Sequence, residues 1–539
     1  MSSLGRPGAW LGWRAWLAGR GRAPALGIAL GAVALALVSY VVVGPFLAAR
    51  YPMMTDLPFH AANASALRHY FDPAWHFQEQ FELQPFAVPY VSFYGLAAFF
   101  MLFVGPLAAV KVAAALMLAL LPAGLAVLAW GMRKSPLLGL PGLGLVWGGL
   151  TSWGFLNFMG ALGLFAAVVG LALRALDRPS RAATLGLALA LVAVFFTHVF
   201  RFPFAIAAVV GSAVCLYPAT RRVRPVVLPV LGASALFVAW WLVRPAEVGG
   251  SLGKLAPDPK RLGALGEHLY RSLTDPAEAA AAQSAAYWLL ALALGLAVVL
   301  VLDGRLRRRT RRELWFDAGA HAVVAASAAV FLGLYLTLPM EIGLWWYVYP
   351  REATAAVYVG LGLLPDLPRA GWLRALAVAA MCAALVPLGT VTARAYRAFD
   401  HATADFARIV ARLPQAPKLL YLVLEHGGSV ATHTPFIHLP AWVQADKGGW
   451  LSFHFAMWRN SPVVYRDPAE PGAVVPPPVP LRWEWTPERF RVLRHGPFFD
   501  WFLVRARSRP DAIFAADPSI AFVAEEGTWF LYRRTAPAP

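Results

Sequence analysis

An acid and an imidazole stand four residues apart just after the first strongly apolar stretch of the chain. In the segment Tyr51-Pro-Met-Met-Thr-Asp-Leu-Pro-Phe-His60, a helix would place the side chains of Asp56 and His60 on one face. A carboxylate can accept a proton from a hydroxyl nucleophile, or it can hold a divalent cation. Asp56 could equally cap a helix beginning near Leu57-Pro58, because an acid ahead of a first-turn proline is a typical helix start. Both roles fit the sequence.

Further polar residues stand at the ends of other apolar stretches. Asn157, His198 and Arg201 each lie at such an end, and Arg351 and Glu352 follow a run of aromatic residues. Ionisable groups at membrane depth are costly, so they usually face a cavity or a partner. The planar guanidinium group of arginine can bind two phosphate oxygens at once. An acid, histidines and arginines on one face would suit a reaction on a lipid phosphate.

Each of these residues also has an ordinary structural role. His198 could be a hydrogen-bonded histidine at a helix end. Arg201 and Arg351 could extend their charged ends to the lipid headgroups. The run Trp345-Trp346-Tyr347 could form an aromatic belt at the membrane interface, or it could stack on a sugar or act as a lid.

The composition is that of a polytopic membrane protein. Of the 539 residues, 59% are hydrophobic and 14% are charged, and the mean hydropathy is +0.57. A soluble protein of this length could not bury so much apolar surface. The net charge of +18 does not indicate a nucleic-acid partner, because the arginines cluster in short loops between apolar stretches. Cys215 and Cys382 lie in apolar runs without metal-ligand spacing.

The apolar stretches indicate about 11–13 membrane segments, each of roughly 20 residues or somewhat fewer. The stretch at 87–104, between Pro89 and Gly105-Pro106, presents a difficulty. If it crossed together with the next stretch, the chain would reach the wrong face. We therefore expect 87–104 to be re-entrant or to lie along the interface; the alternative is that one of the later stretches does not cross as counted. The candidates are 25–47, 87–104, 107–130, 137–152, 156–173, 182–200, 203–217, 226–243, 285–302, 317–339, 353–366 and 373–393.

Basic residues set the predicted orientation. Six arginines lie between residues 305 and 312, which predicts a cytoplasmic loop there. Counting crossings from that loop places the N-terminus in the cytoplasm and Asp56 outside. The predicted domains are a membrane domain at 1–393, with a first outer loop at 48–86, and an extracytoplasmic α/β domain at 394–539. Strand-like runs at 418–424 and 499–505, and a hairpin-like run at 521–533, support the second domain.

With these features in view, the chain resembles the GT-C superfamily of membrane glycosyltransferases, which use polyprenyl-phosphate-linked sugars. The resemblance rests on Thr55-Asp-Leu-Pro-Phe-His60 after the first apolar stretch and on Pro85-Phe-Ala-Val-Pro-Tyr90 opening the next. It also rests on Gly105-Pro-Leu-Ala-Ala-Val-Lys111, on the many-segment body and on the outer C-terminal domain.

The resemblance implies roles for particular residues. Asp56 would be the catalytic base or the ligand of a divalent cation, Mg or Mn, with His60 supporting it. Arg351 or Arg201 would bind the donor phosphate. Many members have a second acid, whereas this chain has a single acid at Asp56, and the later outer loop offers Glu341 or Glu352. The remaining residues of the predicted substrate site are His198 and Asn157.

The sequence thus predicts a multi-pass inner-membrane glycosyltransferase. It would move a sugar from a polyprenyl-phosphate donor to a glycan, lipid or protein acceptor on the extracytoplasmic face of the bilayer. The alternative is a non-catalytic protein with a GT-C-like body that acts in lipid or polysaccharide transport or assembly. No Walker loop or serine-hydrolase elbow occurs, so ATP-driven transport and acyl hydrolysis have no support.

Overall fold

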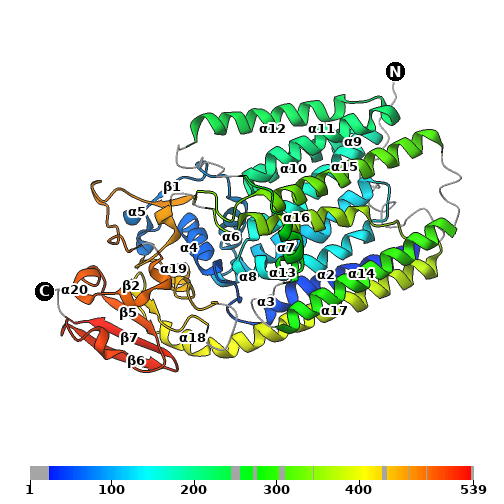
Figure 1. Cartoon of the computed structure of the whole chain (residues 1–539). Coiled ribbons are helices and arrows are strands. Elements are labelled where there is room, and N and C mark those ends of the chain that lie inside the picture. The colour runs from blue at the N-terminus through cyan, green and yellow to red at the C-terminus, as the bar shows by residue number, and fades with distance from the viewer. Residues whose placement is uncertain are drawn as a thin grey trace, which may run out of the picture.

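The structure is a computed structural model in which a bundle of long helices carries a small mixed domain at one end (Figure 1). The chain ends in that small domain, and the axes of most of the long helices are roughly aligned (Figure 1). The described residues are 24–244, 255–270, 276–302, 310–343, 345–427, 434–458, 461–480 and 482–535. Four of the six arginines of the predicted cytoplasmic loop lie at 305–309, outside the described residues.

Within the described residues, eight helices are long and apolar enough to cross a membrane. Their length follows from the sequence, because runs rich in Leu, Ala and Val bury no polar side chain and form helices readily. They confirm a polytopic helical membrane protein. The eight are Ala25–Ala48 (α2, η1 and α3), Pro106–Gly131 (α7), Leu156–Asp177 (α9), Val199–Thr220 (η4 and α11), Arg224–Val243 (α12), Pro276–Leu302 (α14), Arg311–Thr337 (α15) and Gly371–Ala402 (α17).

The other predicted segments form shorter elements. The stretch at 137–152 is a 3-10 helix, η3 (Pro136–Leu145), followed by α8 (Gly149–Trp153). The stretches at 182–200 and 353–366 contain α10 (Arg181–Thr197) and the end of α16 (Val348–Gly360). Within 87–104 the helix is α6 (Ser92–Phe100). It spans about 14 Å, less than half of a roughly 30 Å hydrocarbon core, as expected for a segment that does not cross.

The first outer loop folds into the C-terminal domain instead of lying apart from it. Its main helix, α4 (Leu57–Arg68), is buried along most of its length and packs against α19 (Ala441–Lys447) and α6. Two shorter helices, η2 (Pro73–Trp75) and α5 (Phe77–Gln80), follow. The strand β1 (Phe81–Leu83) then pairs antiparallel with β4 (Val463–Tyr465). The loop and the C-terminal domain therefore form one structural unit.

The C-terminal domain is of the α/β type, as predicted. Its five-stranded sheet has the order β3-β2-β5-β7-β6. The central strands β2 (Lys418–Val423) and β5 (Trp501–Arg505) are parallel, and β6 (Ile520–Glu526) and β7 (Trp529–Arg534) form the predicted hairpin. The remaining elements are β3 (Trp450–Leu451), α18 (Ala404–Val410), α20 (Val492–His495) and the short 3-10 helices η9 (Phe455–Trp458), η10 (Trp483–Trp485), η11 (Pro487–Arg489) and η12 (Asp511–Ile513). The preceding helix, α17, continues past residue 393 to Ala402.

Glycines bring α7 and α9 into close backbone contact in the middle of the bundle. A Cβ at Gly124 would overlap the carbonyl oxygen of Gly163, and a Cβ at Gly131 would overlap that of Gly170. Small residues at such contacts let helix backbones approach, which is how membrane helices gain packing energy without a hydrophobic driving force. This contact fixes α9, whose start carries the loop beside Asp56.

We expect Gly163→Leu to destabilise the protein by at least about 1–3 kcal/mol, because the added side chain must push α7 and α9 apart. The melting temperature of the detergent-purified protein measures this. Gly333→Leu is the matched control, because a Cβ at Gly333 meets nothing within 4 Å. Equal melting temperatures for the two variants would contradict the close contact.

Candidate functional site

The C-terminal end of α8 and the loop after it fix the backbone around Asp56. The N–H groups of Thr55 and Asp56 donate to the carbonyl oxygens of Ser152 and Trp153, at 2.9 and 3.1 Å. Gly154 packs directly on the acid: its φ of +100° favours glycine, and a Cβ there would lie 3.2 Å from the Cβ of Asp56. A membrane-domain loop distant in sequence thus holds the acid in place.

The carboxylate of Asp56 is hydrogen-bonded to a histidine of the C-terminal domain. Asp56 occupies the N-cap position of α4, yet its side chain makes no capping bond to that helix. Instead, Oδ1 accepts a hydrogen bond from Nδ1 of His438 at 3.1 Å. An ionised carboxylate can only accept, so His438 carries its proton on Nδ1. The side chains are 18% and 5% exposed, respectively, so the acid is accessible while its partner is buried.

His438 was not predicted from the sequence. It precedes α19 and lies 382 positions from Asp56 along the chain. The rings of Phe59 and Phe455 lie 4.7 and 5.4 Å from its ring, centroid to centroid. Its Nε2 is buried and has no hydrogen-bond partner among the described residues. The one signal available in the sequence was the predicted placement of the C-terminal domain on the same face as Asp56.

A second buried acid, Glu484, lies within electrostatic range of this pair. Burial raises the pKa of Glu484, the charge on His438 opposes that rise, and the charge on Asp56 adds to it. Its Oε2 is buried without a hydrogen-bond partner in the described part of the chain. Glu484 belongs to η10 (Trp483–Trp485), and sequence reasoning also missed it. The C-terminal domain thus contributes an imidazole bonded to Asp56 and a carboxyl group that interacts with it electrostatically.

His60 lies beside Asp56 but bonds elsewhere. Its Nδ1 is 2.8 Å from the hydroxyl oxygen of Tyr94, which belongs to α6. Burial lowers the pKa of His60, whereas the negative charge of Asp56 acts in the opposite direction. The imidazole is therefore neutral near pH 7. The predicted pair of Asp56 and His60 is close in space, and each of its members has its own partner.

Arg351 is held over an aromatic ring on the same side of the bundle. Its guanidinium carbon lies 3.9 Å from the ring centroid of Phe155, in the loop that holds Asp56. Nε and Nη2 donate to the carbonyl oxygens of Tyr347 and Trp346, at 3.1 and 2.7 Å. Arg351 also interacts electrostatically with Asp56. The run Trp345-Trp346-Tyr347 thus has a role that the sequence did not suggest, because the carbonyl groups of Trp346 and Tyr347 fix Arg351.

Arg201 and Glu352 bind each other. Nη1 of Arg201 donates to Oε2 of Glu352 at 2.7 Å, and a second hydrogen bond joins Nη2 to Oε1. The side chains are 3% and 8% exposed, and the rings of Phe158 and Phe331 flank the guanidinium group. The planar guanidinium group binds both oxygens of the carboxylate, so each charge is paired with the other. Both residues were predicted to bind substrate. In this structure their side chains are hydrogen-bonded to each other.

The remaining two predicted residues support the segment before α6. Asn157 accepts from the N–H of Phe93 and donates to the carbonyl oxygen of Tyr90, both at 3.2 Å. The ring nitrogens of His198 lie 3.3 and 3.4 Å from the hydroxyl of Tyr90. The Tyr90 ring in turn packs against Trp345 at 5.1 Å. Asn157 and His198 thus lie one residue layer behind Arg351.

The described residues do not fit a protein-built metal site. They contain no group of three or more His, Cys, Asp and Glu side chains that could hold a metal ion. Asp56 supplies a single carboxylate, one oxygen of which is already bonded to His438. Zinc and calcium sites use at least three protein ligands, whereas Mg²⁺ is bound through one or two carboxylates together with substrate phosphates. The role of Asp56 as a ligand of Mg or Mn therefore stays a prediction.

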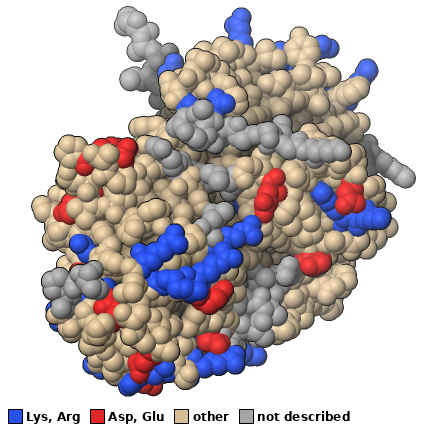
Figure 2. Space-filling view, turned by 60° about the vertical axis from the view of Figure 1, so that its left-hand side comes forward, with Lys and Arg blue, Asp and Glu red and all other residues tan. Residues whose placement is uncertain are grey.

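Charged side chains are visible on the end of the molecule that carries the C-terminal domain. Figure 2, which brings that end forward, shows Lys and Arg side chains in a band across the middle of the view, with Asp and Glu at its edges. Large exposed apolar side chains, by contrast, are frequent along α12 and α14, which is the pattern of helices that face lipid.

Comparison of the sequence with models of protein families finds no match, and comparison with curated proteins finds none. Comparison of the structure with solved structures finds the crystal structure of ArnT from Cupriavidus metallidurans bound to undecaprenyl phosphate. The two chains are 15% identical, with a TM-score of 0.47, and the match covers 98% of this chain and 100% of that chain.

The pairing of Arg201 with Glu352 predicts a particular pattern of stability. Glu352→Gln leaves a buried guanidinium group without its carboxylate, so we expect it to lower the free energy of unfolding by about 3–5 kcal/mol. The double variant Arg201→Met, Glu352→Met removes both charges and should be close to wild type in stability. Thermal unfolding of the purified variants measures both effects. A Glu352→Gln protein that is fully stable but no longer binds undecaprenyl phosphate would instead favour the substrate role.

Proposed function

We propose that this protein is an inner-membrane glycosyltransferase that moves a sugar from a polyprenyl-phosphate donor to an acceptor on the extracytoplasmic face. The observation that carries the proposal is the arrangement of Asp56 and Arg351. A partly exposed carboxylate, held by a buried histidine, lies within electrostatic range of an arginine stacked on Phe155. A base beside a phosphate-binding cation is what transfer from a lipid phosphate requires.

In this proposal Asp56 is the general base. The acceptor hydroxyl gives its proton to the Asp56 carboxylate while its oxygen forms a bond to the anomeric carbon of the sugar. The bond between that carbon and the phosphate oxygen breaks, and the electron pair leaves with the polyprenyl phosphate. The hydrogen bond from His438 fixes the orientation of the carboxylate, which leaves its second oxygen available for the proton.

Arg351 holds the leaving phosphate. Its stacking on Phe155 and its bonds to two carbonyl oxygens fix the plane of the guanidinium group before any substrate arrives. A preorganised cation aimed at the charge that develops on the leaving group stabilises the transition state more than the ground state. Arg201 is the other candidate for this role, and its pairing with Glu352 favours Arg351.

The C-terminal domain completes the site. His438 and Glu484 both come from it, and each has a buried polar atom without a hydrogen-bond partner among the described residues. His438 is hydrogen-bonded to Asp56, and Glu484 interacts electrostatically with both residues. We assign to this domain the positioning of Asp56 and the exclusion of water from the base. The acceptor then enters between the domain and the membrane helices.

Sidedness follows from the charge pattern. The basic loops that contain Arg133, Arg221 and Arg311 lie at the ends of helices opposite Asp56, because α9, α11 and α15 each connect the two ends. Arginine-rich loops stay in the cytoplasm. Asp56, Arg351 and the C-terminal domain are therefore assigned to the extracytoplasmic face.

Asp56→Asn should abolish transfer and leave the melting temperature unchanged, because the amide keeps the shape of the carboxylate but cannot take the proton. Loss of a general base typically costs about 10²–10⁴-fold in rate. The measurement is mass spectrometry of lipid and glycan extracts from a deletion strain that carries each variant. Asp72→Asn is the control, since this acid of the same loop caps η2 far from any proposed chemistry. Full product formation by the Asp56→Asn strain would refute the assigned role.

Arg351→Gln should weaken the binding of a polyprenyl phosphate by about 10–100-fold, because hydrogen bonds to a charged group contribute about 1.5–3 kcal/mol. Undecaprenyl phosphate titrated into the purified protein in nanodiscs is the probe. Arg244→Gln is the matched control. Arg244 also stacks on an aromatic ring, with its guanidinium carbon 3.2 Å from the ring centroid of Trp241, and it also donates to a carbonyl oxygen. Equal affinities for the two variants would show that Arg351 does not hold the phosphate.

A further inference from the structure

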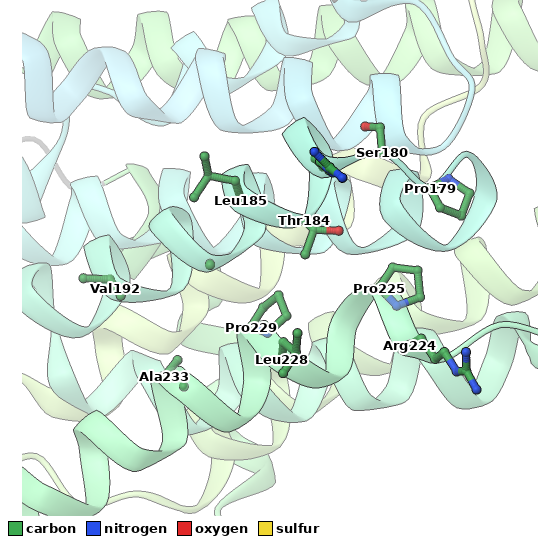
Figure 3. Close-up of a pocket in the computed structure, with 13 residues that line it drawn as sticks. Pro179, Ser180, Thr184, Leu185, Val192, Arg224, Pro225, Leu228, Pro229 and Ala233 are labelled. Atoms are coloured by element: carbon green, nitrogen blue, oxygen red, sulfur yellow. The ribbon is translucent and has the colours of Figure 1, made fainter. Parts of the chain in front are cut away.

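A groove of about 750 Å³ runs between α10 and α12, and the residues that line it take no part in the site around Asp56. The close-up in Figure 3 shows the two helices facing each other across it, with Pro179, Ser180 and Arg224 near one end and Val192 and Ala233 near the other. Its walls are apolar along most of their length, and they include Leu185, Ala188, Val192, Leu228, Pro229 and Ala233.

Two arginines stand at the open end of this groove. Arg181 is the first residue of α10 and Arg224 the first of α12, and both are exposed. Neither makes an ion pair with another described residue, whereas the neighbouring acid, Asp177, is already bound by Arg133 and Arg178. The groove thus offers two cations without a counter-ion at the end of an apolar channel.

The length of the groove matches one leaflet of a bilayer. From Arg181 to Val192 the path along α10 is about 16 Å, and from Arg224 to Ala233 along α12 it is about 14 Å. A hydrocarbon core is roughly 30 Å thick, so the groove spans about half of it. Helix α10 leads from Arg181 towards His198 on the Asp56 side, so the arginines face the opposite leaflet.

We propose that this groove binds an anionic glycerophospholipid of the leaflet opposite Asp56. The lipid phosphate lies between the guanidinium groups of Arg181 and Arg224, and one acyl chain lies along the apolar walls. The charge complementarity identifies the headgroup, since two unpaired cations favour an anionic lipid over a zwitterionic one. The half-bilayer length favours an acyl chain, because a polyprenyl chain would extend far beyond Val192.

The position of the groove gives such a lipid a structural effect. α12 packs on α10, but it contributes few buried residues, namely Val226, Pro229, Ala233 and Trp240. A bound lipid bridges the two helices at the end where their first residues carry like charges. It therefore neutralises the repulsion between Arg181 and Arg224 and holds α12 against the bundle.

The test is a lipid titration of the delipidated, detergent-purified full chain, followed by native mass spectrometry. The probes are phosphatidylglycerol, phosphatidylcholine and undecaprenyl phosphate. We expect phosphatidylglycerol to bind more tightly than phosphatidylcholine to the wild type, and the binding of undecaprenyl phosphate at the Arg351 site to be unaffected by changes in the groove. The double variant Arg181→Gln, Arg224→Gln should lose about fivefold in affinity for each arginine. Gly232→Leu, which places a side chain in open space inside the groove, should weaken phosphatidylglycerol binding without a change in charge.

Two controls separate the groove from the general basicity of this end. Arg178→Gln with Arg221→Gln removes two exposed arginines that do not line the groove, and Gly211→Leu adds a side chain in open space on α11. Both controls should keep wild-type affinity. The proposal is overturned if the control arginine pair loses as much affinity as the groove pair, which would indicate diffuse attraction. It is also overturned if Gly232→Leu binds normally, or if the groove double variant loses as much affinity for undecaprenyl phosphate as for phosphatidylglycerol.

Discussion

The hydrogen bond between Asp56 and His438 is the contact on which the site depends, because it joins the first outer loop to the C-terminal domain. Other contacts reinforce the same junction. The Ser65 hydroxyl donates to the carbonyl oxygen of Ala445, the Gln80 amide donates to that of Gly449, and β1 pairs with β4. A single hydrogen bond contributes only about 1 kcal/mol, so the carboxylate keeps its orientation because this whole junction is packed and bonded.

The polar residues of the membrane region fall into two groups by the partner they have. In the first group, Arg201 is hydrogen-bonded to Glu352, and Asn157 is hydrogen-bonded to the backbone near Tyr90. These residues use their polar groups on one another and form a closed, rigid layer. Asp56 and Arg351 keep exposed faces. Buried charges that are paired cost less than free ones, so the closed layer supports the open one without competing for a substrate. In preorganised sites, paired residues of this kind hold the reactive side chains in place while those side chains stay accessible to the substrate.

The sequence predicted what depends on local pattern and on the membrane. Apolar runs predicted the long helices, and strand-like runs predicted β2, β5 and the hairpin. The count of membrane crossings predicted that the segment containing α6 does not cross. From the sequence, Asp56, His60 and Arg351 could be proposed for the site, because each stands at the end of an apolar stretch. His438 and Glu484 could not be found, because nothing near them in the sequence shows an interaction with an acid that lies 382 positions from His438 and still farther from Glu484. For Arg201 and Glu352, chemistry suggested a ligand and only tertiary packing could show that they bind each other.

Helix α17 links the basic end of the bundle to the C-terminal domain as one continuous rod. Its 32 residues span about 48 Å, whereas a hydrocarbon core is roughly 30 Å thick. The excess length carries α17 out of the hydrocarbon core, and Thr403 alone separates it from α18. The C-terminal domain is therefore joined to the bundle by a helix and not by a flexible linker, so its position is set by the same element that packs against α3 and α14.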